Sequence, residues 1–385
     1  MLRYGRAENL PHLLHKERRW LALAATGGGM LEPWQHNFLK GFARILSNKS
    51  LDPVGRGDGR FTQAQINALW LREGVAEFPA APLFGFYHTY EPHAPYHDAR
   101  FAEGLPRGRV AVPFNEGNYL AGGQKALTAD YSAEEQAFIG ALYDGDVAAS
   151  DAALDELLRL PGGGSLLDRG WLIVTSDHGE EFWDHGGMSH GHSLYEELLH
   201  VPLLIVPPGG LETGVRIAEP VSLLDLFPTA CELAGLAPPP NLLGRSLKPL
   251  LSPDAEARAK VQLPAPPGLF VHCATYHGPT RWAIRRGNWK YILSLDVETW
   301  KKDEANRRML RLEPEELYDL ALDPREEKNL IAEKECAEVR KQLADALALL
   351  RATVLKPLEL SPDRQAVQPP PLDPALLEQL KKLGY

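Results

Sequence analysis

Three apolar runs along the chain end abruptly in polar residues, and this pattern predicts buried strands. "WLIV" at 171–174 breaks into "TSDHG", and the run that begins at residue 82 breaks at Glu91, Pro92 and His93. A third run covers 201–209 and ends in "PPG". Short apolar runs bounded by turn residues are typical of strands buried on both faces. Because ligands of open α/β sheets bind beyond the carboxyl ends of the strands, these polar ends are candidate functional segments.

Helical patterns separate the predicted strands. A helix is expected over 132–160, and the short stretch "SLYEELLH" precedes the third strand. The order β-α-β-α-β is typical of a layered α/β domain. Proline-rich coil after "VSLLDLFPTACELAGL" predicts a boundary, so we expect an α/β domain over residues 1–255 and a small α+β subdomain over residues 256–385.

The C-terminal part has its own patterns. "RWAIRRGNWKYILSL" predicts a strand pair that turns at 286–288, and residues 328–354 have the periodicity of one amphipathic helix. The predicted subdomain therefore combines a short antiparallel sheet with a helix.

Composition narrows the classes of partner. The chain has 385 residues with 44% hydrophobic and 24% charged, which indicates a folded globular protein. A net charge of -10 argues against binding to nucleic acid or to an anionic membrane surface. No apolar run approaches the roughly 18 residues of a membrane span, and the first 20 residues lack an apolar signal core. The sequence indicates neither a compartment nor an oligomeric state.

Candidate chemistry concentrates between residues 174 and 197, "VTSDHGEEFWDHGGMSHGHSLYEE". Asp177 and His178 follow a predicted strand, so a carboxylate oxygen and an imidazole nitrogen can face the same crevice, while Gly179 allows a sharp turn. This is half of a metal site. The alternative is that Asp177 caps the next helix and His178 is a hydrogen-bonded loop residue.

The remaining histidines and glutamates of this segment have two interpretations. His190 and His192, separated by one glycine, can both face an oxyanion, or both can belong to a solvated loop. His185 is predicted either to be structural or to support a residue that contacts the ligand. The four glutamates are predicted to be solvated charges at helix ends: Glu180, Glu181, Glu196 and Glu197.

Several segments in the same order resemble the sulfatase family within the alkaline-phosphatase-like superfamily. They are "YHTYEPHAPY", the segment from "TSDHGEEFWDHGG" to "VPLLIVPPG", "VSLLDLFPTACELAGL" with "GRSLKPLL", and "ELYDLALDPREEKNL". The resemblance covers most of residues 80–385. It implies an alkaline-phosphatase-like α/β domain with a central, mostly parallel sheet and a small C-terminal subdomain.

The resemblance also implies a mechanism. In the family, a formylglycine made from a Cys or Ser attacks the sulfur of a sulfate ester beside a calcium ion. Carried over to this sequence, Asp177 and His178 are metal ligands and His93 contacts the sulfate. His190 or His192 stands where many members use a lysine beside the leaving oxygen. The implied partner is a small-molecule or carbohydrate sulfate ester.

The sequence departs from the family pattern in two ways. No adjacent Asp-Asp pair occurs, so the first-strand half of the calcium site is missing, and weak calcium binding is expected. None of the three cysteines lies in the formylglycine motif Cys/Ser-x-Pro-Ser/Ala-Arg, and no serine replaces them. Two explanations remain: Met1 is an internal methionine of a longer product, which we favour, or the chain is a natural, inactive relative.

These departures leave three functional hypotheses. The first is a sulfatase-like hydrolase whose lineage hydrolyses sulfate esters, with no turnover by this chain alone. The second is a phosphoryl-transfer or phosphodiesterase member of the same superfamily. The third is a non-catalytic protein that retains the anion pocket.

Overall fold

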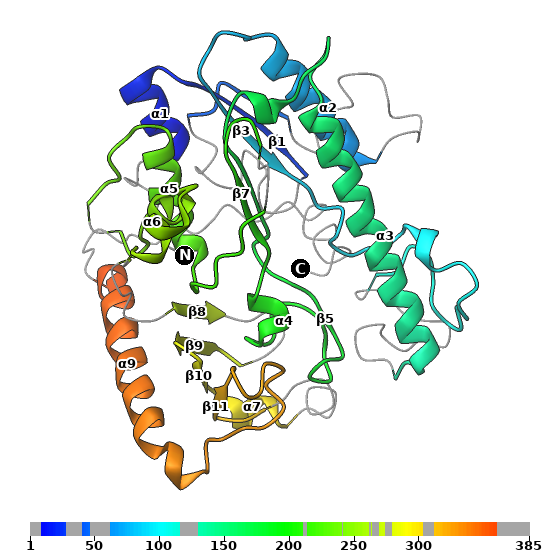
Figure 1. Cartoon of the computed structure of the whole chain (residues 1–385). Coiled ribbons are helices and arrows are strands. Elements are labelled where there is room, and N and C mark those ends of the chain that lie inside the picture. Colours follow the sequence, from blue (N-terminus) through cyan, green and yellow to red (C-terminus); the bar gives the residue numbers. More distant parts are fainter. Residues whose placement is uncertain are drawn as a thin grey trace.

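The computed structural model describes most of the chain, in the ranges 9–27, 41–46, 62–115, 130–210, 214–240, 242–261, 263, 269–273, 279–302 and 312–359. A larger α/β part is stacked on a smaller part built around a four-stranded sheet (Figure 1). Strand β5 and helix α4 lie between the two parts (Figure 1). None of the helices in these ranges combines the length and apolar character that a bilayer crossing requires.

Strand β1 (Leu21–Thr26) is the centre of a parallel sheet. It pairs with β2 (Arg44–Leu46) on one side and β3 (Leu83–His88) on the other. The register places Thr26 opposite His88, so β1 and β3 end at the same level. The central strand is apolar and buried up to its last residue because helices and neighbouring strands enclose it.

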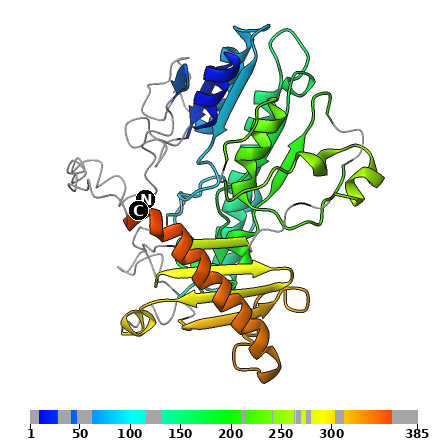
Figure 2. The ribbon, with the colours of Figure 1, turned by 90° about the vertical axis from the view of Figure 1, so that its left-hand side faces the viewer.

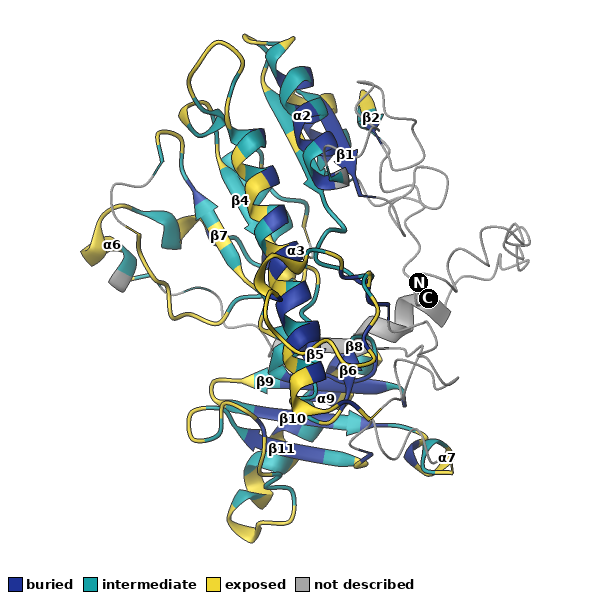
Figure 3. Ribbon diagram, turned by 90° about the vertical axis from the view of Figure 1, so that its right-hand side faces the viewer, coloured by how far each residue is buried: buried dark blue, intermediate teal, exposed yellow. Residues whose placement is uncertain are grey.

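Two long helices cover one side of this sheet (Figures 1 and 3). Helix α2 (Gln63–Ala76) packs against β1 and β3, and α3 (Ala133–Leu158) packs against α2. Each helix begins with a capping box, in which Thr62 or Ser132 exchanges hydrogen bonds with the third helical residue. Helix α1 (Leu10–Arg18) also contacts β1. The helix predicted over 132–160 is confirmed as α3.

The other two predicted strands are present as β4 (Leu172–Thr175) and β7 (Leu203–Val206), and they pair with each other in antiparallel orientation. The expectation that they are buried on both faces is wrong, because β4 is half-buried and Leu204 of β7 is 50% exposed. Within the described ranges, this pair is not hydrogen-bonded to the parallel sheet of β1, β2 and β3. The predicted α/β class is therefore confirmed, with a parallel three-stranded sheet and a separate antiparallel pair.

The smaller part is an antiparallel sheet crossed by one helix. Its strands follow the order β11-β10-β9-β8, and α9 (Ala337–Glu359) crosses one face of the sheet (Figure 2). The predicted turn is confirmed, because Gly287 has φ +56° between β9 and β10. Helix α9 starts later than the predicted residue 328, because a turn and a short 3-10 helix (Lys334–Cys336) precede it. The strands are β8 (Leu269–Cys273), β9 (Arg281–Arg286), β10 (Trp289–Ser294) and β11 (Glu315–Asp319).

Short elements complete the fold. The predicted stretch "SLYEELLH" contains α4, and α6 begins at the expected boundary near residue 255, although the division into 1–255 and 256–385 stays a prediction. Residues 360–385 lie outside the described ranges. The short elements are β5 (Glu181–Phe182), β6 (Met188–Ser189), α4 (Glu196–Leu199), α5 (Leu226–Leu233), α6 (Ala255–Ala259), α7 (Val297–Trp300) and the 3-10 helices at Ala99–Phe101, Leu166–Asp168, Leu223–Asp225 and Lys248–Leu251.

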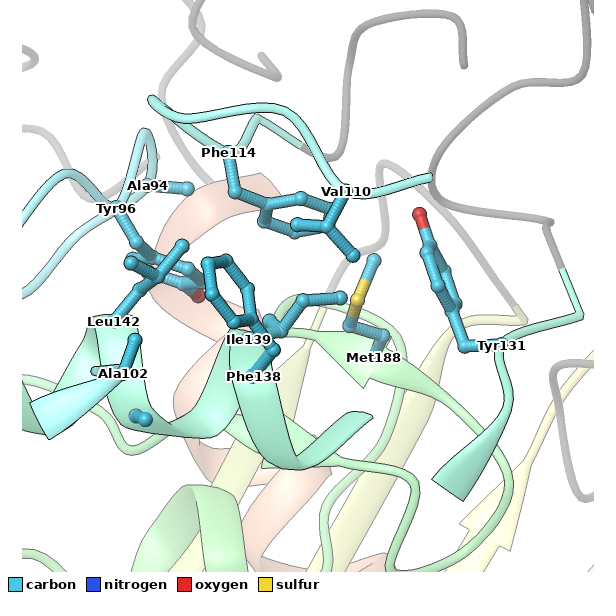
Figure 4. Packing of buried hydrophobic residues seen from close by; sticks show 11 residues of the cluster. Ala94, Tyr96, Ala102, Val110, Phe114, Tyr131, Phe138, Ile139, Leu142 and Met188 are labelled. Carbon is cyan, nitrogen blue, oxygen red and sulfur yellow. The ribbon is translucent and has the colours of Figure 1, made fainter. Parts of the chain in front are cut away.

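One buried cluster joins the loop after β3 to the segment after β4. Ala94 and Tyr96 come from that loop, Ile139 comes from α3, and Met188 comes from β6. Figure 4 shows Met188 beside Ile139, with Tyr131 on its other side. All four residues named first are at most 2% exposed. His93 precedes Ala94 in the chain, and His190 lies two residues after Met188. Because Ala94 and Met188 belong to one packed cluster, His93 and His190 lie close together.

Candidate active site

His93 is held in the loop that follows β3. Its backbone N–H donates to Tyr90 O at 3.0 Å, and its Nδ1–H donates to Ala94 O at 2.6 Å. Burial lowers the pKa of His93 below its ordinary value, and the neighbouring His190 lowers it further. The ring is therefore anchored through Nδ1, and a neutral ring carries its acceptor on Nε2.

Asp177 and His178 follow the end of β4. The Asp177 side chain is 82% exposed, and its Oδ1 lies 3.8 Å from His178 Nε2. His178 Nδ1–H donates to Gly179 O at 2.8 Å. Gly179 does not adopt a positive φ; instead, a Cβ there would lie 2.0 Å from Glu197 O, so the glycine permits a close approach to α4 rather than the sharp turn expected from the sequence.

His190 joins the two strand ends. Its ring centroid lies 4.0 Å from that of His178 and 5.0 Å from that of His93. Its Nδ1–H donates to Glu180 Oε1 at 2.9 Å, and Glu180 Oε2 accepts from Tyr96 OH at 2.9 Å. We call His93, His178 and His190 the histidine cluster. In all three rings Nδ1 is the nitrogen that donates to a neighbouring oxygen.

His192 lies elsewhere, although only one residue separates it from His190. His192 is 3% exposed, and its Nε2–H donates to Glu181 Oε2 at 2.6 Å. Gly187 makes room for this pair, because a Cβ there would lie 2.6 Å from His192 Nε2. Burial raises the pKa of Glu181, but the hydrogen bond and charge of His192, together with the backbone hydrogen bonds from Gly187 and His185, outweigh burial, and the pKa lies below its ordinary value. Of the two histidines that the sequence left open, His190 is the one beside His93.

The prediction that the four glutamates are solvated charges is wrong. The side chains of Glu180 and Glu181 are 5% and 1% exposed, and each binds a histidine. Those of Glu196 and Glu197 are 18% and 16% exposed, and they bind Lys290 and His185 respectively. A carboxylate can be buried when partners compensate its charge. Glu180 and Glu181 find their histidine partners across the β5–β6 hairpin, which the sequence did not predict, and Glu196 finds Lys290 in a distant part of the chain. His185, predicted to be structural, binds Glu197 at 2.7 Å and stacks on Tyr195 at 3.7 Å.

Two further rings extend the cluster, and the sequence interpretation missed them. His88 is the last residue of β3, and its ring centroid lies 5.3 Å from that of Tyr90, which in turn lies 4.8 Å from that of His93. Burial lowers the pKa of His88, and its Nδ1 accepts from Gly27 N–H at 3.3 Å. The sequence feature that could have identified His88 is its position where an apolar strand becomes polar.

The described residues supply only part of a calcium site. Calcium prefers six to eight oxygen ligands. Asp177 supplies a carboxylate and His178 an imidazole, and no group of three or more His, Cys, Asp or Glu side chains in the described ranges is arranged to hold a metal ion. The donors present therefore fit half of the expected site, and we derive no chemical step through a metal.

Family profiles match both parts of the chain. The profile described as Sulfatase matches residues 63–236, which include every residue of the histidine cluster. The profile described as N-sulphoglucosamine sulphohydrolase, C-terminal, matches residues 184–353. The chain belongs to the sulfatase family. The alkaline-phosphatase-like α/β fold that the resemblance implied is the fold of this family.

Curated relatives of this sulfatase-family chain include arylsulfatase K from several vertebrates. The protein of Mus musculus is 33% identical over 233 residues, which are 60% of this chain and 39% of the relative. That of Homo sapiens is 32% identical over 230 residues, which are 59% of this chain and 40% of the relative. The sulfatase-family chain therefore spans about two fifths of the length of these relatives.

Solved structures share the fold of this sulfatase-family chain. The phosphonate monoester hydrolase of Agrobacterium radiobacter has a TM-score of 0.63 at 22% identity, covering 91% of this chain and 81% of that one. A 2-O GAG sulfatase has a TM-score of 0.60 at 19% identity, with coverages of 92% and 75%. A protein solved with its substrate D-glucosamine-2-N,6-O-disulfate also scores 0.60 at 19% identity, with coverages of 94% and 84%.

Proposed function

We propose that this chain carries the sulfate-binding half of a sulfuric ester hydrolase, with the histidine cluster as the anion site. The observation that supports this most strongly is the meeting of His93, His178 and His190 at the ends of two strands. Rings anchored through Nδ1 present Nε2, which donates to an anionic oxygen when protonated. Preorganised donors of this kind stabilise negative charge without reorganisation during the reaction.

Each member of the cluster has a proposed role. His93 contacts the sulfate group. His190 faces the leaving oxygen, because Glu180 holds its Nδ1–H at 2.9 Å and fixes the orientation of the ring. Asp177 and His178 are proposed as the calcium ligands of this half-site, and calcium would supply charge compensation for the sulfate oxygens. His192, which we also considered for the leaving oxygen, is proposed to support the loop through Glu181.

The proposal separates binding from turnover. Hydrolysis through an enzyme-bound sulfate needs a nucleophile, and the 385 residues contain no Cys/Ser-x-Pro-Ser/Ala-Arg motif. We therefore expect these residues to bind sulfate esters without hydrolysing them, and a longer gene product with that motif to be active. The proposed substrates are aryl sulfates or sulfated sugars; one similar structure was solved with D-glucosamine-2-N,6-O-disulfate.

The first experiment measures binding. Inorganic sulfate is titrated into isotope-labelled residues 1–385, and the ring resonances of His93 and His190 are followed. We expect both to shift with saturation, and His93→Ala or His190→Ala to weaken binding about tenfold, the scale for losing one charge-assisted hydrogen bond. His15→Ala is the matched control, since His15 is exposed in the last turn of α1.

The second experiment measures hydrolysis. Residues 1–385 and any longer in-frame product are compared on a chromogenic aryl sulfate. We expect turnover only with the longer product, lowered about 10²-fold by His93→Ala or His190→Ala. Turnover by residues 1–385 that survives both substitutions would show that the histidine cluster is not the reactive site.

Two other functions are tested by the same materials. A phosphonate or phosphodiester hydrolysed in preference to the sulfate would favour phosphoryl transfer, for which the likeness to the phosphonate monoester hydrolase shows the fold alone. Sulfate binding with no activity in any longer product would favour a non-catalytic anion-binding protein.

A further inference from the structure

Three charged side chains from distant parts of the chain meet at the start of α4. Lys290 Nζ lies 2.9 Å from Glu196 Oε1 and 2.8 Å from Glu326 Oε1. The side chains of Lys290 and Glu326 are 2% and 0% exposed. We call Lys290, Glu196 and Glu326 the clamp. A lysine this deeply enclosed requires opposite charge beside it, so the clamp fixes the C-terminal sheet to α4.

The clamp also reaches the segment that carries the histidines. Glu326 Oε2 accepts from Glu196 N–H at 2.6 Å, and Glu326 O accepts from His185 Nε2–H at 3.3 Å. His185 Nδ1–H in turn donates to Glu197 Oε1 at 2.7 Å. One loop residue of the C-terminal part therefore binds both α4 and the turn between β5 and β6, and it does so from a left-handed backbone conformation, φ +54°.

The β5–β6 hairpin connects His185, which the clamp holds, with His190 of the histidine cluster. Its register places Glu181 opposite Ser189. Glu180 precedes the first of these residues and His190 follows the second, so both lie just past the same end of the hairpin and form their 2.9 Å hydrogen bond there. His185 lies in the turn at the other end, where its backbone N–H donates to Glu181 Oε1 at 3.1 Å.

We infer that Lys290 is a positioning residue for His190, through the clamp, His185 and the β5–β6 hairpin. This inference rests on the proposed function, because it makes the C-terminal sheet a determinant of sulfate binding at the histidine cluster. The lysine does not contact the cluster itself. A clamp that only joined two parts of the fold would affect unfolding and leave the ring of His190 where it is.

The test uses the full chain with two substitutions of the clamp. Lys290→Met removes the cation and leaves Glu196 and Glu326 facing each other. Lys290→Met with Glu326→Gln removes one cation and one anion together, so that Arg285, 3.1 Å from Glu196 Oε2, balances the remaining charge. Lys341→Met is the control, since Lys341 pairs with Asp345 on the exposed side of α9.

Two readouts are needed. Ring resonances of the histidines report position, and titration with inorganic sulfate reports affinity. In the double variant we expect the resonances of His185 and His190 to move, those of His12 and His15 on α1 to stay, and sulfate affinity to fall about tenfold, the lower end for losing a residue that orients a ligating group. The control variant should match the unsubstituted chain in both.

The outcomes separate this inference from the proposed function. Unmoved His190 resonances in the double variant, with unchanged sulfate affinity, would overturn the positioning role of Lys290. Moved resonances with unchanged affinity would overturn the link from the clamp to the anion site. If the unsubstituted chain fails to bind sulfate, the proposed function fails, and the resonances still decide whether Lys290 positions His190.

Discussion

The histidine cluster and the clamp treat charge in opposite ways. The clamp places a lysine within 3 Å of two carboxylates, and Arg285 lies 3.1 Å from the other oxygen of Glu196. The cluster instead brings three imidazoles together. Burial lowers the pKa of His93, and the neighbouring His190 lowers it further. The first arrangement pairs opposite charges, whereas the second disfavours a positive charge on His93. The comparison teaches that opposite charges join distant segments in one region, whereas hydrogen bonds through Nδ1 hold three imidazoles close together in the other.

The largest expected effect tests the clamp as a stabilising element. Lys290→Met removes the cation beside the buried Glu326, and an uncompensated buried charge costs about 3 kcal/mol. Urea unfolding followed by circular dichroism should show this loss in the free energy of unfolding. Lys341→Met on α9 should leave the free energy of unfolding nearly unchanged, because it breaks an exposed pair. Equal losses in the two variants would remove the contrast.

A second test compares the neighbours His190 and His192. His192→Ala leaves the buried Glu181 without its imidazole partner, and we expect a loss of about 2 kcal/mol in the free energy of unfolding. His190→Ala should instead cost about 1.4 kcal/mol in sulfate binding, or tenfold in affinity, with less change in stability. The two measurements are unfolding in urea and titration with inorganic sulfate. Reversed effects would place His192 rather than His190 at the anion.

The pH dependence of stability tests a third charged pair, at the start of α3. Hydrogen bonding to Arg109 lowers the pKa of Glu135 from 4.5 to about 2. A depressed folded-state pKa contributes stability that is present above pH 4.5 and is lost as the pH falls toward 2. Glu135→Gln should therefore lower the unfolding temperature by a few degrees at pH 7 and progressively less below pH 4.5, measured by scanning calorimetry. A difference that grows on acidification would contradict this assignment.

The smallest effect is expected at Asp177. Its carboxylate is 82% exposed, and the described residues supply only His178 beside it for the proposed calcium site, so calcium should bind weakly. Calorimetry should give a dissociation constant no tighter than about 10⁻⁴ M, the range of weak calcium modules, and Asp177→Ala should abolish the remaining heat. Submicromolar binding that Asp177→Ala leaves intact would show that the metal lies elsewhere.

The sequence by itself was enough for the strand ends and the family. Apolar runs that break into polar residues located β3, β4 and β7, although these strands are half-buried rather than buried on both faces. The same positions named His93, Asp177 and His178, and the ordered motifs indicated the sulfatase family, which the family profiles support.

Tertiary structure alone decided the partners. The glutamates at 180, 181, 196 and 197 looked like solvated charges because their partners do not follow from local spacing. Lys290 lies 94 residues from Glu196, and no periodicity links them. His190 and His192 have nearly identical sequence surroundings, yet one lies beside His93 and the other lies buried against Glu181. Sequence pattern reports whether a position meets water or core, whereas the identity of a charge's partner depends on how distant segments pack.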